Sequence, residues 1–212
     1  MLLFIQMSSN LRIRILAFGA SLTEGYYFGG LQFHPYTIRL GQCLRSIYST
    51  VDINNAGVSG EAVLSQTMFP RLKNLLSSVE NNHYDWVLIL AGTNDILRDQ
   101  VKASRVFEGY KLLIDECQKH GARVLAMTLP ETVYVQEPDE LQRKEYNRLI
   151  REELPSKNNV EVLDVDQLLP YHSLSSNERQ KIWDDGVHLT PDGYDRLGEL
   201  IYDKLRNSIF NH

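Results

Sequence analysis

Several features that point to particular protein classes are scarce or missing in this chain of 212 residues. It has two cysteines, Cys43 and Cys117, which are not spaced for a metal site or a redox motif. Two free, buried thiols in a reducing compartment are the simplest interpretation. The sequence also contains no Asn-x-Ser/Thr sequon, which agrees with an intracellular protein. We therefore expect a cytoplasmic location.

Charge and hydropathy argue against further classes of protein, namely nucleic-acid-binding, membrane and secreted proteins. The formal net charge is -5 and there is no basic block, so neither nucleic acid nor an anionic membrane surface is an expected partner. No apolar run approaches the roughly 18 to 20 residues of a membrane-spanning helix. Residues 1–10 lack the basic region and long apolar core of a secretory signal, so we expect an N-terminal tail there.

Motifs for cofactors are missing as well. The histidines lack the paired spacing of metal ligands, and neither a Walker A motif nor Gly-x-Gly-x-x-Gly occurs. We therefore expect no metal and no cofactor.

What the chain does contain is a regular alternation of apolar runs and amphipathic segments. Its apolar content of 43% and charged content of 23% are ordinary for a globular protein. The pattern predicts strands at 13–18, 51–57, 86–90, 124–129 and 160–165, and helices at 35–48, 63–79, 102–120, 139–154 and 191–209. Pro70 is expected to kink or split the second helix.

Short apolar strands that alternate with helices are typical of a parallel sheet covered on both faces. The predicted fold class is therefore α/β, a three-layer α/β/α sandwich of the flavodoxin type with a five-stranded parallel sheet. No linker or repeat interrupts residues 11–212, so we expect a single domain there. Many chemistries share this fold, so the fold leaves the function open.

A serine follows the first predicted strand at once. Residues 18–25 read Phe-Gly-Ala-Ser-Leu-Thr-Glu-Gly, a sharp exit that places the hydroxyl of Ser21 at the carboxyl end of the strand. Open α/β sheets bind their ligands at this end. Taken alone, a serine in a turn or at a helix cap is the commoner explanation. Three later segments reverse that interpretation.

These segments lie at other strand ends or before the last helix. They read Asn-Ala-Gly-Val-Ser-Gly-Glu at 55–61, Gly-Thr-Asn-Asp at 92–95 and Asp-Asp-Gly-Val-His at 184–188. Individually, the glycines are typical of turns, the Asn-Asp pair of a helix cap and the histidine of a surface position. Because the carboxyl ends of parallel strands meet at one edge, their joint occurrence favours a single site.

The residue types match the needs of a nucleophilic serine. A serine hydroxyl requires a base to take its proton, and histidine, with an ordinary pKa of about 6.5, suits that task. A carboxylate on the other ring nitrogen would hold the imidazole in one tautomer. Asp185 precedes His188 by three residues, so one tight turn can bring these side chains together.

The developing oxyanion needs hydrogen-bond donors that are already in place. The backbone N–H groups of Ser21 and Gly60 and the side-chain amide of Asn94 are three candidates. Gly60 is plausible because a residue without Cβ lets a substrate approach the backbone closely. Gly57 is its rival for that place.

With these blocks in view, the chain resembles the SGNH hydrolase superfamily, also called GDSL esterases and lipases, from residue 13 to the last helix. The segments 92–95 and 185–188 are similar to the family's G-x-N-D and D-x-x-H blocks, while 19–23 and 55–60 resemble its first and second blocks. Gly-x-Ser-x-Gly is missing, and the acid and the base are nearly adjacent. Both features argue against the α/β-hydrolase fold.

The resemblance implies a role for each of these residues. Ser21 would be the nucleophile and first oxyanion donor, His188 the general base and Asp185 the carboxylate that orients it. Gly60 and Asn94 would complete the oxyanion hole. One departure is Ala20, which stands where the family's Gly-Asp-Ser-Leu block has aspartate. Other groups must then support this loop.

Two aromatic segments are candidates for an acyl pocket, one after the serine at 26–34 and one at 132–136. Within them, Tyr26, Phe28, His34 and Tyr134 are the candidate substrate-binding residues; the alternative is that they pack against the core or each other. No lid or large apolar run is visible in the sequence. We therefore expect hydrolysis of small-molecule carboxylic esters with short or medium acyl chains, through an acyl-serine intermediate, and leave the oligomeric state open.

Two alternatives use the same residues differently. In an acyltransferase, an alcohol or a sugar would replace water in deacylation. A binding protein of the flavodoxin type would instead hold phosphate or a flavin at these loops, but the Asp185–His188 pair would then have no role.

Overall fold

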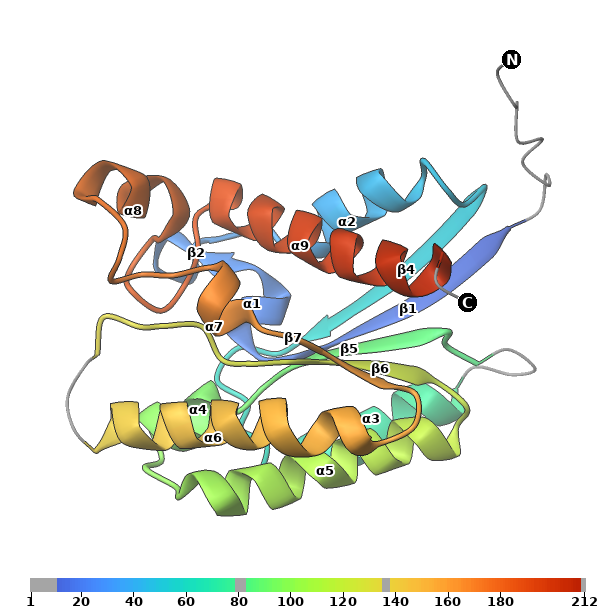
Figure 1. The fold of residues 1–212 in the computed structure, drawn as a ribbon, viewed down its shortest axis with the longest axis horizontal. Coiled ribbons are helices and arrows are strands. Elements are labelled where there is room, and N and C mark those ends of the chain that lie inside the picture. Colours follow the sequence, from blue (N-terminus) through green and yellow to red (C-terminus); the bar gives the residue numbers. More distant parts are fainter. Residues whose placement is uncertain (1–10, 79–82, 135–137, 211–212) are drawn as a thin grey trace.

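The fold, seen in a computed structural model, is described for residues 11–78, 83–134 and 138–210 (Figure 1). Its centre is a sheet of five parallel strands in the order β4-β1-β5-β6-β7. This is the flavodoxin-type strand order, so the predicted sheet is confirmed. The strands are β1 (Arg12–Gly19), β4 (Thr50–Gly57), β5 (Trp86–Leu90), β6 (Arg123–Met127) and β7 (Val160–Leu163).

Helices cover both faces of the sheet, which confirms the three-layer sandwich (Figure 1). One face carries α2 (Thr37–Leu44) and α9 (Pro191–Phe210), and the other carries α3 (Met68–Ser77), α5 (Ala103–Lys119) and α6 (Asp139–Glu153). All five residues of β5 are buried. Burial on both faces explains why this strand has no polar alternation in the sequence.

Shorter elements escape the sequence pattern because they span too few residues to show a period. Four are helices: α1 (Ser21–Glu24), α4 (Thr93–Leu97), α7 (Val165–Leu168) and α8 (Ser176–Ile182). The others are the hairpin of β2 (Tyr26–Tyr27) and β3 (Gln32–Phe33) and the 3-10 turns η1 (Phe28–Gly30) and η2 (Leu154–Ser156). The predicted strand at 160–165 accordingly ends early, where α7 begins.

The second predicted helix, at 63–79, needs correction, and its last residue lies outside the described residues. Helix α3 begins at Met68, so Pro70 lies in its first turn and does not kink it. A proline is tolerated there because the first turn has no N–H partner to lose. The backbone N–H groups of Val63 and Leu64 donate instead to the carboxylate of Asp95, at 2.7 and 3.0 Å.

The expected tail at 1–10 lies outside the described residues, and the single domain at 11–212 stays a prediction. In the described part of the chain, buried side chains from the sheet and both helix layers form one hydrophobic cluster. No helix in those residues is long and apolar enough to cross a membrane.

A buried charged network fixes the loop between β6 and α6. Arg143, only 2% exposed, donates to the carboxylate of Glu140 at 2.7 and 2.8 Å and to the carbonyls of Leu129 and Pro130 at 3.1 and 3.2 Å. It also pairs with Asp166. Burial opposes ionisation of both carboxyls, but Arg143, together with Lys144 at Glu140 and Arg151 at Asp166, outweighs it and holds their pKa values below the ordinary range. The loop that leaves β6 is thereby held at its start.

We predict that Arg143→Met lowers the free energy of unfolding by about 3 to 5 kcal/mol, because two carboxylates lose their buried partner. Urea unfolding at neutral pH measures the change. The matched control is Arg148→Met on the same helix, where the pair with Glu145 is exposed and worth at most about 1 kcal/mol. Equal losses in the two variants would contradict this account of the network.

Candidate active site

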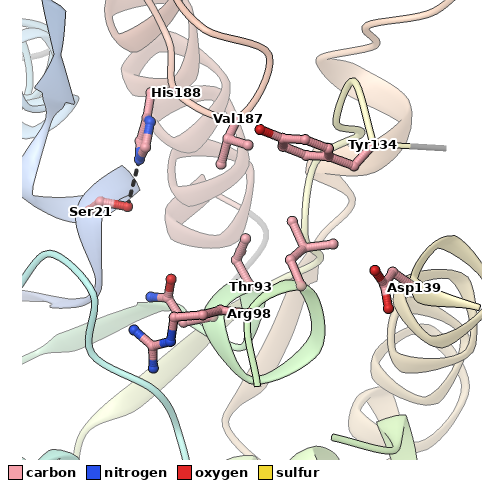
Figure 2. A pocket seen from close by; sticks show the side chains of 9 residues that line it. Ser21, Thr93, Arg98, Tyr134, Asp139, Val187 and His188 are labelled. Carbon is pink, nitrogen blue, oxygen red and sulfur yellow. Dashed lines mark hydrogen bonds between the residues drawn. The ribbon is translucent and has the colours of Figure 1, made fainter. Parts of the chain in front are cut away.

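Three predicted side chains form a hydrogen-bonded chain beyond the carboxyl end of β1. Figure 2 shows the bond between Ser21 and His188. Nε2 of His188 lies 2.9 Å from Oγ of Ser21, and Nδ1 lies 2.8 Å from Oδ2 of Asp185. Since an ionised carboxylate only accepts, Nδ1 carries the ring hydrogen of the neutral imidazole. The lone pair of Nε2 therefore faces the hydroxyl of Ser21, as a general base requires.

The carboxylate of Asp185 is held by its own loop. Its Oδ1 accepts from the backbone N–H of Val187 at 3.0 Å and of His188 at 2.8 Å. Burial opposes ionisation of Asp185, but the hydrogen bonds from the His188 side chain and from these N–H groups outweigh it. They hold the pKa of Asp185 well below its ordinary range. The tight turn expected for the Asp-x-x-His spacing is present.

Ser21 is the first residue of α1, so its backbone N–H has no partner one turn earlier in the helix. Ala20 makes no side-chain cap, but its carbonyl accepts from the N–H of Glu24 at 2.9 Å. Arg71, from α3, donates to the carbonyl of Gly19 at 3.4 Å. These contacts supply local support at a loop where the family motif has an aspartate in place of Ala20.

The two rival glycines have different surroundings. The N–H of Gly57 donates to Oδ1 of Asn55 at 3.0 Å, and a Cβ at Gly57 would lie 2.1 Å from the backbone nitrogen of Glu24. Gly57 therefore serves close packing against α1. Gly60 has a φ of +78°, and its N–H makes no hydrogen bond among the described residues. Only Gly60 keeps an N–H available for a ligand.

Charged side chains hold the backbone on both sides of that N–H. The carboxylate of Glu24 accepts from the N–H of Ser59 at 2.8 Å and from its hydroxyl. Nη1 of Arg98 donates to the carbonyl of Gly60 at 2.7 Å. The loop after β4 is thus tied to α1, which begins at Ser21, on one side and to α4 on the other.

The loop after β5 is tied to residues 61–64, which directly follow Gly60. Nδ2 of Asn94 donates to the carbonyl of Glu61 at 2.9 Å, which occupies one of its two amide hydrogens. Asp95 is buried and accepts from the N–H groups of Val63 and Leu64. Burial raises the pKa of Asp95, although these two bonds oppose the rise. Because Asn94 uses one amide hydrogen for the carbonyl of Glu61, its second amide hydrogen is available to a ligand.

A cavity of about 360 Å³ adjoins the serine and the histidine (Figure 2). Besides Ser21, Asn94 and His188, its lining residues are Thr93, Leu97, Arg98, Tyr134, Asp139 and Val187.

The four candidate substrate-binding residues divide into two groups. Tyr134 lines the cavity, and the ring of Tyr26 lies against that of His188, with 4.4 Å between centroids. Phe28 and His34 are not among the lining residues. The N–H of Phe28 donates to Asp184 at 2.7 Å, and Nε2 of His34 lies 2.8 Å from Asp195. The structure thus places Tyr134 in the cavity and Tyr26 against His188, whereas Phe28 and His34 do not line the cavity.

Arg98 and Asp139 line the cavity but were not predicted from the sequence. Arg98 follows Asn94 by four residues at the end of α4, so a predicted helix there would have placed both on one face. Asp139 gave no comparable signal, because it is the first residue of a helix that begins well after its strand. Within the described ranges, no group of three or more His, Cys, Asp or Glu side chains is arranged to hold a metal ion.

Comparison with known proteins identifies the family to which the chain belongs. Residues 17–196 match the model of the GDSL-like Lipase/Acylhydrolase family, and the chain therefore belongs to this family. It is accordingly a carboxylic ester hydrolase. A comparison with curated proteins gives no significant match.

Solved structures share the fold at low sequence identity. A structure of a putative arylesterase from Agrobacterium tumefaciens is 20% identical, with a TM-score of 0.72, covering 92% of this chain and 99% of that one. The lipase/acylhydrolase from Enterococcus faecalis is 22% identical, with a TM-score of 0.71 and coverages of 92% and 96%. A carbohydrate acetylesterase family member from Sinorhizobium meliloti is 17% identical, with a TM-score of 0.72 and coverages of 92% and 97%.

We predict that Glu24→Ala lowers kcat about tenfold with a smaller change in KM, because the loop that presents the N–H of Gly60 loses one of its two braces. Loss of a whole oxyanion donor typically costs about 10² to 10³. Steady-state kinetics on an activated ester measures both constants, and thermal unfolding checks the fold. Glu24→Gln keeps an acceptor and should recover most of the rate. An unchanged kcat in a folded Glu24→Ala protein would show that Glu24 is not needed to hold this loop.

A second prediction concerns acid stability. The pKa of Asp185 is lowered in the folded protein relative to an ordinary value of about 3.9. Its stabilising contribution is therefore complete above about pH 4 and is lost as the pH falls below that value. Urea unfolding should show that Asp185→Asn has a lower free energy of unfolding than wild type at pH 7. This difference should become smaller below about pH 4.

The control for this experiment is Asp203→Asn, which alters an exposed carboxylate on α9 that makes no hydrogen bond among the described residues. For this variant, the difference in free energy of unfolding from wild type should not become smaller below about pH 4. A gap for Asp185→Asn that stays constant from pH 7 to pH 3 would count against the lowered pKa.

Proposed function

We propose that the protein is a serine esterase that hydrolyses carboxylic esters with short or medium acyl chains through an acyl-serine intermediate. The observation that carries the proposal is the chain of hydrogen bonds from Ser21 to His188 to Asp185, at 2.9 and 2.8 Å, beside a cavity. This geometry is that of a nucleophile, its base and the group that orients the base.

In the first half-reaction, Oγ of Ser21 attacks the ester carbonyl carbon while Nε2 of His188 takes the hydroxyl proton. The tetrahedral intermediate carries a negative oxygen. Its collapse breaks the bond to the alcohol oxygen, which receives the proton from His188 and leaves. Asp185 holds the imidazole in place and stabilises its charged form throughout.

In the second half-reaction, a water molecule attacks the acyl-serine while His188 again accepts a proton. Collapse of this second intermediate returns the proton to Oγ of Ser21 and releases the carboxylic acid. Hydrogen bonds from the N–H groups of Ser21 and Gly60 and from Nδ2 of Asn94 stabilise both oxyanions. The available N–H of Gly60 and the second amide hydrogen of Asn94 support these roles.

The size of the cavity supports short or medium acyl chains. At about 360 Å³ it lies near the lower end of the range of about 300 to 1,000 Å³ that is usual for ligand pockets. Leu97 and Val187 give it apolar surface. The cytoplasmic location also remains part of the proposal, and Cys43 and Cys117, which are both free, support a reducing compartment.

We predict that a fluorophosphonate probe labels the wild-type protein at Ser21. Labelling should disappear in Ser21→Ala and slow at least about a hundredfold in His188→Ala, because the hydroxyl loses its base. Mass spectrometry identifies the labelled peptide. Ser78→Ala, at the end of α3 and outside the cavity, is the matched serine control and should label as wild type does.

Absence of labelling in folded wild-type protein, or labelling that persists in Ser21→Ala, would reject the proposal. Product analysis with an added acceptor alcohol then distinguishes hydrolysis from acyl transfer. A free acid as the main product supports the esterase, whereas a new ester supports the acyltransferase.

A further inference from the structure

The part of the cavity away from Ser21 carries a carboxylate at the start of α6, where the helix dipole favours an acidic side chain. Asp139, the first residue of α6, lines the cavity, and its carboxylate points into it (Figure 2). It makes no hydrogen bond or ion pair with the residues that the structure describes. None of residues 1–10, 79–82, 135–137 and 211–212 is a lysine or an arginine that would pair with it. The carboxylate therefore has no ion-pair partner among the described residues, and it presents to a ligand a negative charge that only the N-terminus of α6 partly offsets.

The other charged lining residue, Arg98, does not offset this charge. Its Nε and Nη2 donate to the carboxylate of Asp99 at 2.7 and 2.9 Å, and its Nη1 donates to the carbonyl of Gly60. Figure 2 shows its guanidinium directed away from Asp139. The charge of Arg98 is thus balanced by its own neighbour, and the cavity as a whole favours a cation.

Next to the carboxylate, the cavity has an aromatic wall. Tyr134 is 55% exposed, and its ring lies between Val187 and Asp139 in Figure 2. An aromatic ring attracts an ammonium group through its quadrupole, and a nearby carboxylate adds a direct charge interaction. A single carboxylate is too few ligands for a metal ion, but one carboxylate with one ring suits an organic ammonium group.

The loop that carries Tyr134 is held against the loop of the catalytic base. The N–H of Val133 donates to the carbonyl of Gly186 at 2.8 Å, and Nε2 of His172 lies 2.8 Å from the carbonyl of Thr132. The backbone beside Tyr134 is therefore tied to the loop that carries His188, so the aromatic wall is held next to the site.

We propose that the preferred substrate is an ester that carries an ammonium group, with the cation between Asp139 and Tyr134 while the ester carbonyl lies at Ser21. This inference rests on the proposed esterase function and adds its substrate class. A sugar hydroxyl is the competing ligand for Asp139, because it would also donate to the carboxylate. The unbalanced charge favours the cation.

The test compares two esters of the same shape and acyl chain, butyrylcholine and its neutral carbon analogue 3,3-dimethylbutyl butyrate. We expect kcat/KM to be about tenfold higher for the cation, a ratio in keeping with one charge pair and one cation–π contact at a partly exposed site. The ratio should shrink as salt is added, since screening weakens exposed charge interactions. Wild-type ratios at or below one would overturn the proposal.

Variants test which residues cause the preference for the cationic ester. Asp139→Asn should reduce the ratio to near one, and Tyr134→Leu should reduce it partly. The matched control, Asp203→Asn, removes the same charge outside the cavity and should keep the wild-type ratio. A ratio that persists in Asp139→Asn would also overturn the proposal. Equal use of both butyrates, together with faster hydrolysis of an acetylated sugar that depends on Asp139, would identify the sugar as the ligand.

A binding experiment separates this proposal from the proposed function. Calorimetry on Ser21→Ala protein measures the Kd of butyrylcholine without turnover, and Asp139→Asn in that background should weaken binding about tenfold. If wild-type protein fails to react with fluorophosphonate but this difference in Kd is present, the esterase proposal fails and the cation site stands. If labelling succeeds and the Kd values are equal, the cation site fails and the esterase stands.

Discussion

The candidate active site depends on one hydrogen bond, from the hydroxyl of Ser21 to Nε2 of His188, between residues 167 positions apart. It forms because β1 lies inside the sheet and the chain returns to the carboxyl end of β1 just before α9. A parallel sheet brings the loops after its strands to one edge, whatever their separation in sequence. The fold therefore supplies the close approach, and the Asp-x-x-His turn supplies the direction of the imidazole.

The loops around this bond are held mainly by charged side chains rather than by backbone ladders. Glu24 and Arg98 hold the loop after β4 on its two sides, Arg71 supports the strand end before the serine, and Arg143 holds the loop after β6. Irregular backbone must find partners outside secondary structure. These side chains provide them and fix donors in place before a substrate arrives, which is what oxyanion stabilisation requires.

Much of the fold was predictable, and the errors have physical causes. The central strands were found because buried parallel strands are continuous apolar runs, as at 86–90. The helix predicted from residue 63 was wrong at its start: Val63 and Leu64 are bound through their N–H groups to Asp95, and α3 begins only at Met68. Elements such as α1 and α4 are too short to show periodicity, yet they carry the first oxyanion candidate and the amide of Asn94.

The sequence by itself determined the fold class, the family resemblance and the chemical identity of the serine, aspartate and histidine, because these depend on apolar periodicity and on short motifs. Only the tertiary structure distinguished Gly60 from Gly57, since the difference lies in which N–H a neighbouring side chain occupies. It alone also placed Asp139 in the lining of the cavity that adjoins Ser21. Contacts between side chains from distant segments have no local pattern, so they are decided only when the sheet brings its loops together.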